Sequence, residues 1–138
     1  MKTKPVLAAL LLVVVVAATI VLVWTHLEYS SATRHDTDRW AVLQDVEGTL
    51  LAVEPTRDAV WHQLVALHAN GSRMWVGGVV QRYANKWGFR FTPETILVAQ
   101  VTIEGAQATI RYISENLEYW LTFGVAYVGA IVLDVHGP

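Results

Sequence analysis

The feature that most constrains this chain is an uninterrupted apolar segment near its beginning. From Pro5 to Trp24 the sequence reads PVLAALLLVVVVAATIVLVW, with no charged residue and with Thr19 as the only polar side chain. At about 1.5 Å of rise per residue, a helix of this length spans the roughly 30 Å hydrocarbon core of a bilayer. A helix also satisfies its backbone hydrogen bonds internally, as lipid requires. Residues 5–24 therefore predict a transmembrane anchor, with the membrane as its partner.

A cleaved signal peptide is the alternative explanation of the same segment. Lys2 and Lys4 would form its basic start, and Ser30, Ser31 and Ala32 offer small residues for a peptidase. The apolar part of a secretory signal usually has about 7 to 15 residues, so the greater length here favours an uncleaved signal-anchor. Both alternatives export the rest of the chain.

The charges on either side of the apolar segment predict its orientation. Lys2 and Lys4 precede the segment, whereas His26 and Glu28 follow it. By the positive-inside rule, the N-terminus is expected in the cytoplasm and the remaining chain outside the cell membrane. We therefore expect a single-pass membrane protein with an extracytoplasmic domain, or a secreted domain if the leader is removed.

Charge and cysteine content exclude several classes of protein. Without Lys2 and Lys4, eight basic residues of the ten remain against twelve acidic ones, so the exported part carries about −4. This balance argues against nucleic acid as a partner. The chain has no cysteine, which excludes disulfides, cysteine nucleophiles and thiolate metal sites.

The chain divides into three parts by composition. Residues 1–24 form a cytoplasmic stub and the anchor. Residues 25–40 (THLEYSSATRHDTDRW) are polar, mixed in charge and without apolar periodicity, which is typical of a stalk. Residues 41–138 then form one extracytoplasmic domain of ordinary size.

Strands and helices are mixed along this domain. Pro55 suits a helix start and Gly71 a helix end, so residues 56–70 are expected to be helical. Aromatic residues alternate with polar ones or glycine over residues 86–91, the period of a half-buried strand. A helical apolar stripe predicts a second helix over residues 104–121. Further strands are expected at residues 48–53, 73–83, 96–103 and 126–135.

The last of these strands, residues 126–135, is apolar on both faces and is therefore expected in the middle of the sheet. The predicted fold class is α+β: an N-terminal transmembrane helix, then one small domain with a mostly antiparallel sheet and two helices.

The distribution of charge within the domain suggests a binding surface. Residues 59–93 contain no acidic side chain but several basic ones, interleaved with aromatic residues. Such a surface is suited to an anionic polymer or another anionic ligand. The alternative is that the cations are the solvated face of strands whose aromatic residues belong to the core, as alternation alone predicts. The candidate ligand-binding residues are Arg73, Tyr83, Arg82, Lys86, Trp87 and Arg90.

No pattern in the sequence establishes a metal site or a catalytic site. His62 and His68 are six residues apart, which places them on different faces of the predicted helix, whereas zinc pairs on helices are three or four apart. No serine lies in a nucleophile-elbow pattern, and Gly77-Gly78 lacks the spacing of a phosphate-binding loop. We therefore expect no catalytic residue, no metal and no cofactor.

Residues 70–72 (Asn-Gly-Ser) form an N-glycosylation sequon in the turn after the first domain helix, so Asn70 is a candidate glycosylation site.

The stretch from Trp87 to Leu117, WGFRFTPETILVAQVTIEGAQATIRYISENL, resembles the signature of the BP-seventy-four N-terminal domain family of small exported or membrane-linked domains. The aromatic strand before Pro93, the apolar strand at residues 96–101 and the helix after Glu104 carry the resemblance. The glycine-containing strand at residues 76–80 is similar to the one that precedes that motif. The resemblance implies an exported domain and no particular activity.

Two parts of that pattern differ in this chain. Arg90 and Thr92 stand where the pattern has His and Asp, and residues 105–107 replace its acidic residue and cysteine. If those polar positions form a site in the family, it is lost or altered here.

These observations predict a membrane-anchored, extracytoplasmic, non-catalytic binding domain for an anionic envelope component or a partner protein. A structural or assembly subunit of a membrane complex, paired through its aromatic strand, is the alternative. An unrecognised enzyme is the third reading.

Overall fold

The N-terminal part of the chain is one long helix. In the computed structural model, which describes residues 3–138, α1 spans Thr3–Ala32. Its side chains from Thr3 to Ser31 are exposed. The helix is long and apolar enough to cross a membrane or to act as a signal anchor. This confirms the predicted N-terminal helix.

Helix α1 continues through the first half of the segment expected to be a stalk. Residues 25–32 contain neither proline nor glycine, the residues that most often end a helix. The Thr25 hydroxyl also donates a hydrogen bond to the carbonyl oxygen of Val21, 2.7 Å away. The segment predicted as a stalk, residues 25–40, is therefore helical over residues 25–32. The compact domain that follows begins at Ala32.

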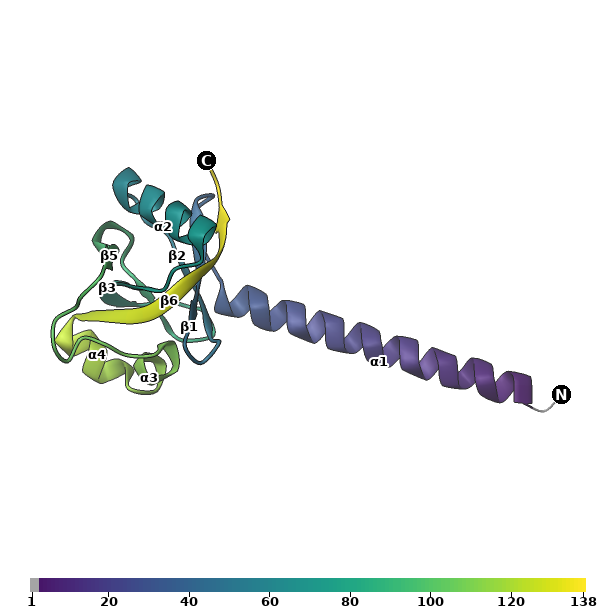
Figure 1. The fold of residues 1–138 in the computed structure, drawn as a ribbon. Helices are drawn as coiled ribbons and strands as arrows, with labels where there is room; N and C mark the ends of the chain where they lie inside the picture. Colours follow the sequence, from purple (N-terminus) through teal and green to yellow (C-terminus); the bar gives the residue numbers. More distant parts are fainter. Residues whose placement is uncertain (1–2) are drawn as a thin grey trace. The chain divides into compact units, whose positions relative to one another are not determined.

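The domain is built on one antiparallel sheet (Figure 1). The strand order is β2-β1-β6-β3-β4, and β5 also pairs with β3. The last strand in the sequence, β6, lies in the middle of this order, as its apolar faces predicted. The strands are β1 (Trp40–Asp45), β2 (Leu50–Val53), β3 (Met74–Arg82), β4 (Phe89–Phe91), β5 (Leu97–Ala99) and β6 (Val125–His136).

Three α-helices accompany the sheet, at two places in the fold. In Figure 1, α2 (Asp58–Asn70) lies near one end of β6, and α3 (Ile110–Glu115) and α4 (Leu117–Phe123) lie near the other. A short 3₁₀ turn, η1, covers Pro93–Thr95. Gly71 caps the C-terminus of α2: its N–H donates to the carbonyl oxygen of Leu67, and its left-handed φ of 69° turns the chain out of the helix. The α+β prediction is confirmed.

The second predicted helix differs from the structure. Residues 104–109 are not helical, because their backbone pairs with β6: Ala108 donates to the Tyr127 carbonyl at 3.0 Å, and Tyr127 donates to the Ala106 carbonyl at 2.8 Å. The helix begins only at Ile110 and is interrupted at Asn116, which divides it into α3 and α4.

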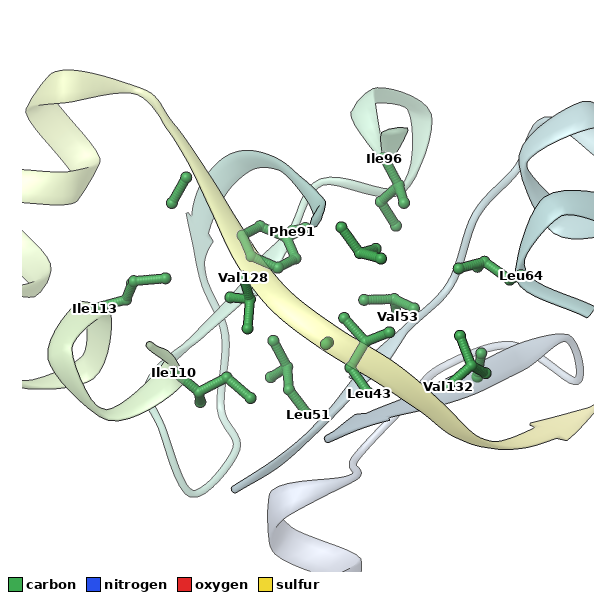
Figure 2. Packing of buried hydrophobic residues seen from close by; sticks show 14 of the residues in the cluster. Leu43, Leu51, Val53, Leu64, Phe91, Ile96, Ile110, Ile113, Val128 and Val132 are labelled. Atoms are coloured by element: carbon green, nitrogen blue, oxygen red, sulfur yellow. The ribbon is translucent and has the colours of Figure 1, made fainter. Parts of the chain in front are cut away.

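Side chains from the sheet and from helices α2 and α3 pack together to form the hydrophobic core (Figure 2). Leu43 and Leu51 come from β1 and β2, Leu64 from α2, and Ile110 and Ile113 from α3, and all five are fully buried. The edge strands β2 and β4 also contact each other, so the sheet is strongly curled. Across this closure the indole N–H of Trp87, just before β4, donates to the Leu50 carbonyl at 2.8 Å.

Candidate functional site

The segment between α1 and β1 is bound to the domain through a buried carboxylate. Glu54 is only 5% exposed. Its Oε1 accepts hydrogen bonds from the backbone N–H groups of Asp36 and Thr37, both at 2.7 Å, and from the Thr37 hydroxyl at 2.9 Å. Its Oε2 accepts from Arg90 at 3.2 Å. The second half of the expected stalk, residues 33–39, is therefore not a free linker.

Tyr83 also belongs to this cluster of contacts. We name the cluster the N-terminal lock and define it as Arg34, Asp36, Glu54, Tyr83 and Arg90. The guanidinium of Arg90 lies 4.6 Å from the Tyr83 ring centroid, and that of Arg34 lies 5.6 Å from it. The Tyr83 hydroxyl donates to Asp36 at 2.8 Å. Burial, followed by the nearby Asp36 carboxylate, raises the pKa of Tyr83 to about 12. The raised pKa reflects the preference for the protonated phenol, which is the form that donates to Asp36.

A ring stack holds the same segment on its other side. The rings of His35 and His136 each stack on the Trp40 ring, with centroid distances of 3.7 Å and 4.2 Å and nearly parallel planes. His136 ends β6, so the stack joins the start of the domain to its last strand. Within residues 3–138 no group of three His, Asp or Glu side chains is placed to hold a metal ion.

The candidate cations of the strand surface do not converge on one site. Arg82 forms an ion pair with Glu118 on α4. Arg90 forms ion pairs with Asp36 and Glu54, both at 3.2 Å. Arg73 precedes the nine-residue strand β3 and Arg82 ends it, which separates them by about 30 Å.

The remaining predicted residues have structural contacts of their own. Arg73 donates to the Gly129 carbonyl at 2.8 Å. The Lys86 ammonium lies 5.0 Å from the Trp87 ring centroid, and that ring packs against the core. Asn70 is the exposed last residue of α2, and its side-chain oxygen accepts from the Ser72 N–H at 2.9 Å. The side-chain nitrogen that a glycan would modify thus belongs to an exposed residue at the C-terminal end of α2.

The structure places a different set of side chains around a surface depression. A hollow of about 470 Å³, which we name the α3–α4 hollow, lies beside these two helices. Tyr112 and Tyr119 are more than half exposed, whereas Trp120 is 2% exposed. The Trp120 ring meets both tyrosine rings edge to face, at centroid distances of 6.3 and 5.2 Å. The lining residues are Gly105, Gln107, Tyr112, Asn116, Tyr119 and Trp120.

Two smaller hollows lie around Trp75. One is about 230 Å³ and the other about 380 Å³, and both are lined by Val46, Trp75 and Gly129. Gly129 has no side chain, and the Trp75 ring lies over it: a Cβ built on Gly129 would be 3.3 Å from that ring. Gln107 lines the smaller of these hollows and also the α3–α4 hollow, so the two depressions adjoin.

Sequence reasoning missed this site, although one signal for it was present. Tyr112, Asn116 and Tyr119 follow the spacing of one helical face, and that face lies opposite the apolar stripe of Ile110 and Ile113. Two tyrosines on a face that is expected to be solvated mark a candidate contact surface.

Comparisons of the chain with family models, curated proteins and solved structures found no match. The resemblance of residues 87–117 to the BP-seventy-four N-terminal domain family therefore stays a prediction.

Proposed function

We propose that this chain is a single-pass membrane protein with a cytoplasmic N-terminus, whose extracytoplasmic domain binds an envelope component without catalysing a reaction. The length and apolar surface of α1 support the anchor. Lys2 and Lys4 before the apolar segment and Glu28 after it support the orientation.

The α3–α4 hollow is the observation that carries the binding function. It combines exposed aromatic rings with amide side chains, the usual lining of a small-ligand site. The cationic strand surface is a weaker candidate for an anionic ligand, because carboxylates already pair with Arg82 and Arg90. A ligand at that surface would have to displace those carboxylates.

The orientation can be tested by single-cysteine labelling, since the chain has no cysteine of its own. A membrane-impermeant maleimide should label Glu47→Cys, in the exposed β1–β2 turn, in intact cells. It should label Thr3→Cys only after the cells are opened. Both variants should stay in the membrane fraction after an alkaline carbonate wash. The reverse labelling pattern would refute the orientation, and a soluble protein that has lost the residue 3 label would show a cleaved leader.

The binding function can be tested by retention of the detergent-solubilised full chain on washed, insoluble envelope material. We expect Tyr119→Ala, which removes an exposed ring of the hollow, to reduce retention about tenfold, the effect of losing one aromatic contact. The matched control is the double charge reversal Arg82→Glu and Lys86→Glu, which should retain the wild-type level.

The envelope material is used before and after protease digestion. Retention that survives digestion and depends on Tyr119 supports binding of a non-protein component in the hollow. Retention that is lost in the charge-reversed variant and unaffected by Tyr119→Ala would instead establish the cationic strand surface. Retention that digestion abolishes would point to a partner protein and contradict the proposal.

A further inference from the structure

The lining of the α3–α4 hollow is polar but uncharged. None of its six residues is an Asp, Glu, Lys, Arg or His. Recognition of phosphate, sulfate or carboxylate ligands normally uses Arg or Lys side chains, which form charge-assisted hydrogen bonds. The chemistry of this lining therefore fits a neutral ligand.

The two amide side chains of the hollow are fixed by the protein. The Gln107 side-chain nitrogen donates to the Thr102 hydroxyl at 2.7 Å, and the Asn116 side-chain nitrogen donates to the Tyr112 carbonyl at 2.9 Å. Each amide keeps a carbonyl oxygen that can accept a hydrogen bond. Because their nitrogens are held, these acceptors are positioned before a ligand binds.

Trp120, which also lines the hollow, carries a further hydrogen-bond donor. Its side chain is 2% exposed, and its indole N–H has no hydrogen-bond partner within residues 3–138. Native structures seldom keep a buried donor without a partner, because such a donor has lost its hydrogen bonds to water. A ligand oxygen that enters beside the tyrosines would provide the missing acceptor.

The exposed rings add a flat apolar surface. Tyr112 is 53% and Tyr119 is 56% exposed, and the ring of Tyr119 is further supported by Phe123, which stacks on it with a centroid distance of 6.0 Å. Such platforms suit a ligand with a flat C–H face and hydroxyl groups around its edge. A sugar ring has this combination.

An extended peptide fits the hollow less well. Peptides in this conformation usually bind by adding a strand to a free sheet edge. The edge of β6 next to Gln107 is already occupied, because the backbone of Ala106 and Ala108 exchanges hydrogen bonds with Tyr127.

We infer that the α3–α4 hollow is a binding site for a neutral carbohydrate chain, with Tyr119 and Tyr112 as stacking platforms and Trp120, Gln107 and Asn116 as hydrogen-bonding groups. This inference rests on the proposed function. Because Gln107 also lines the hollow around Trp75, a linear glycan can continue from one depression to the other, where the Trp75 ring offers a further platform.

The inference is tested by isothermal titration calorimetry on the full chain in a polyoxyethylene detergent, since sugar-based detergents would compete. The probes are chitohexaose, cellohexaose and maltohexaose as neutral glycans, and hexagalacturonate as an anionic glycan of the same length. We expect saturable binding of at least one neutral probe and none of the anionic probe.

Three variants identify the site. Tyr119→Ala should weaken binding about tenfold. Trp120→Phe keeps an aromatic ring but removes the N–H, and should weaken binding about fivefold while leaving the melting temperature unchanged or raised. Val65→Ala, on the exposed side of α2 and outside the hollow, should bind as the wild type does. A Trp120 with only a structural role would leave the affinity of Trp120→Phe unchanged.

The outcomes separate this inference from the proposed function. If no neutral probe binds while envelope retention still depends on Tyr119, the carbohydrate inference is wrong and the proposed function stands. If a neutral probe binds equally to the wild type and Tyr119→Ala, the assignment to this hollow is wrong. If neither retention nor probe binding depends on Tyr119, both proposals fail.

Discussion

Gly77→Ala is expected to destabilise the domain by about 3 kcal/mol or more, which exceeds the usual cost of overpacking. A Cβ atom on Gly77 would lie 1.9 Å from the carbonyl oxygen of Ala126 and 2.7 Å from the Cα of Tyr127. Both are backbone atoms of β6, so no side chain can turn aside. Strands β3 and β6 would have to separate at the centre of the sheet.

The measurement is thermal unfolding of the full chain, followed by circular dichroism. For a domain of this size, the expected loss corresponds to a decrease of roughly 12 °C or more in Tm. Gly71→Ala is the control: no atom lies within 4 Å of its new Cβ, but its φ of 69° costs about 1 kcal/mol. Equal decreases in Tm for the two variants would show that β3 and β6 are not packed this closely.

The parts of the fold that the sequence predicted depend on local patterns. Helix α2 follows from a capping glycine and an apolar face within one stretch of chain, and β6 follows from a continuous apolar run. Of the apolar stripe Ala106, Ile110, Ile113, Leu117 and Leu121, the first three are fully buried, and the last two are partly buried against the core. The stripe did not predict conformation at Ala106, because pairing with β6 outweighs the local preference for helix.

Strand β1 is the element that the sequence did not reveal. Residues 41–43 are apolar without alternation and follow a polar segment, so no local pattern marks them as a strand. They form a strand because β2 and β6 pair on either side of it. The pairing with β6 joins residues about ninety positions apart, which no local window can detect.

Long-range contacts also explain why the predicted cationic surface could not be judged from the sequence. Residues 59–93 contain no acidic residue, but in the folded domain Arg82 and Arg90 of this segment pair with carboxylates from other parts of the chain. Glu118, which follows this segment in the sequence, pairs with Arg82. Asp36 and Glu54, which precede the segment, pair with Arg90. A charge pattern identifies which residues are cationic, whereas the tertiary fold decides which of them are neutralised.

Arg90→Met should therefore be far more costly than Arg82→Met, although both remove one arginine from neighbouring strands. Glu54 has a side chain only 4% exposed, so loss of Arg90 leaves a buried carboxylate with backbone and hydroxyl partners but less compensating charge. Removal of one member of a buried pair costs about 3–5 kcal/mol. Because the Arg90 side chain is 21% exposed and water can partly replace it, we expect about 2–3 kcal/mol. Arg82 and Glu118 are both exposed, so that pair contributes at most about 1 kcal/mol.

Thermal unfolding measures the difference in stability between the two variants. Limited trypsin digestion of the full chain shows whether the segment that contains Arg34 and Arg39 has been released. Arg34 and Arg39 are held in the wild type: Arg34 donates to the Ala84 carbonyl at 2.6 Å, and Arg39 pairs with Asp58 at 2.7 Å. Cleavage after these arginines should be slow in the wild type and in Arg82→Met. It should be fast in Arg90→Met, because Glu54 can no longer be held between Arg90 and the backbone of residues 36–37. Rapid cleavage after Arg34 in the wild type would mean that this segment is a free linker and that the lock does not form.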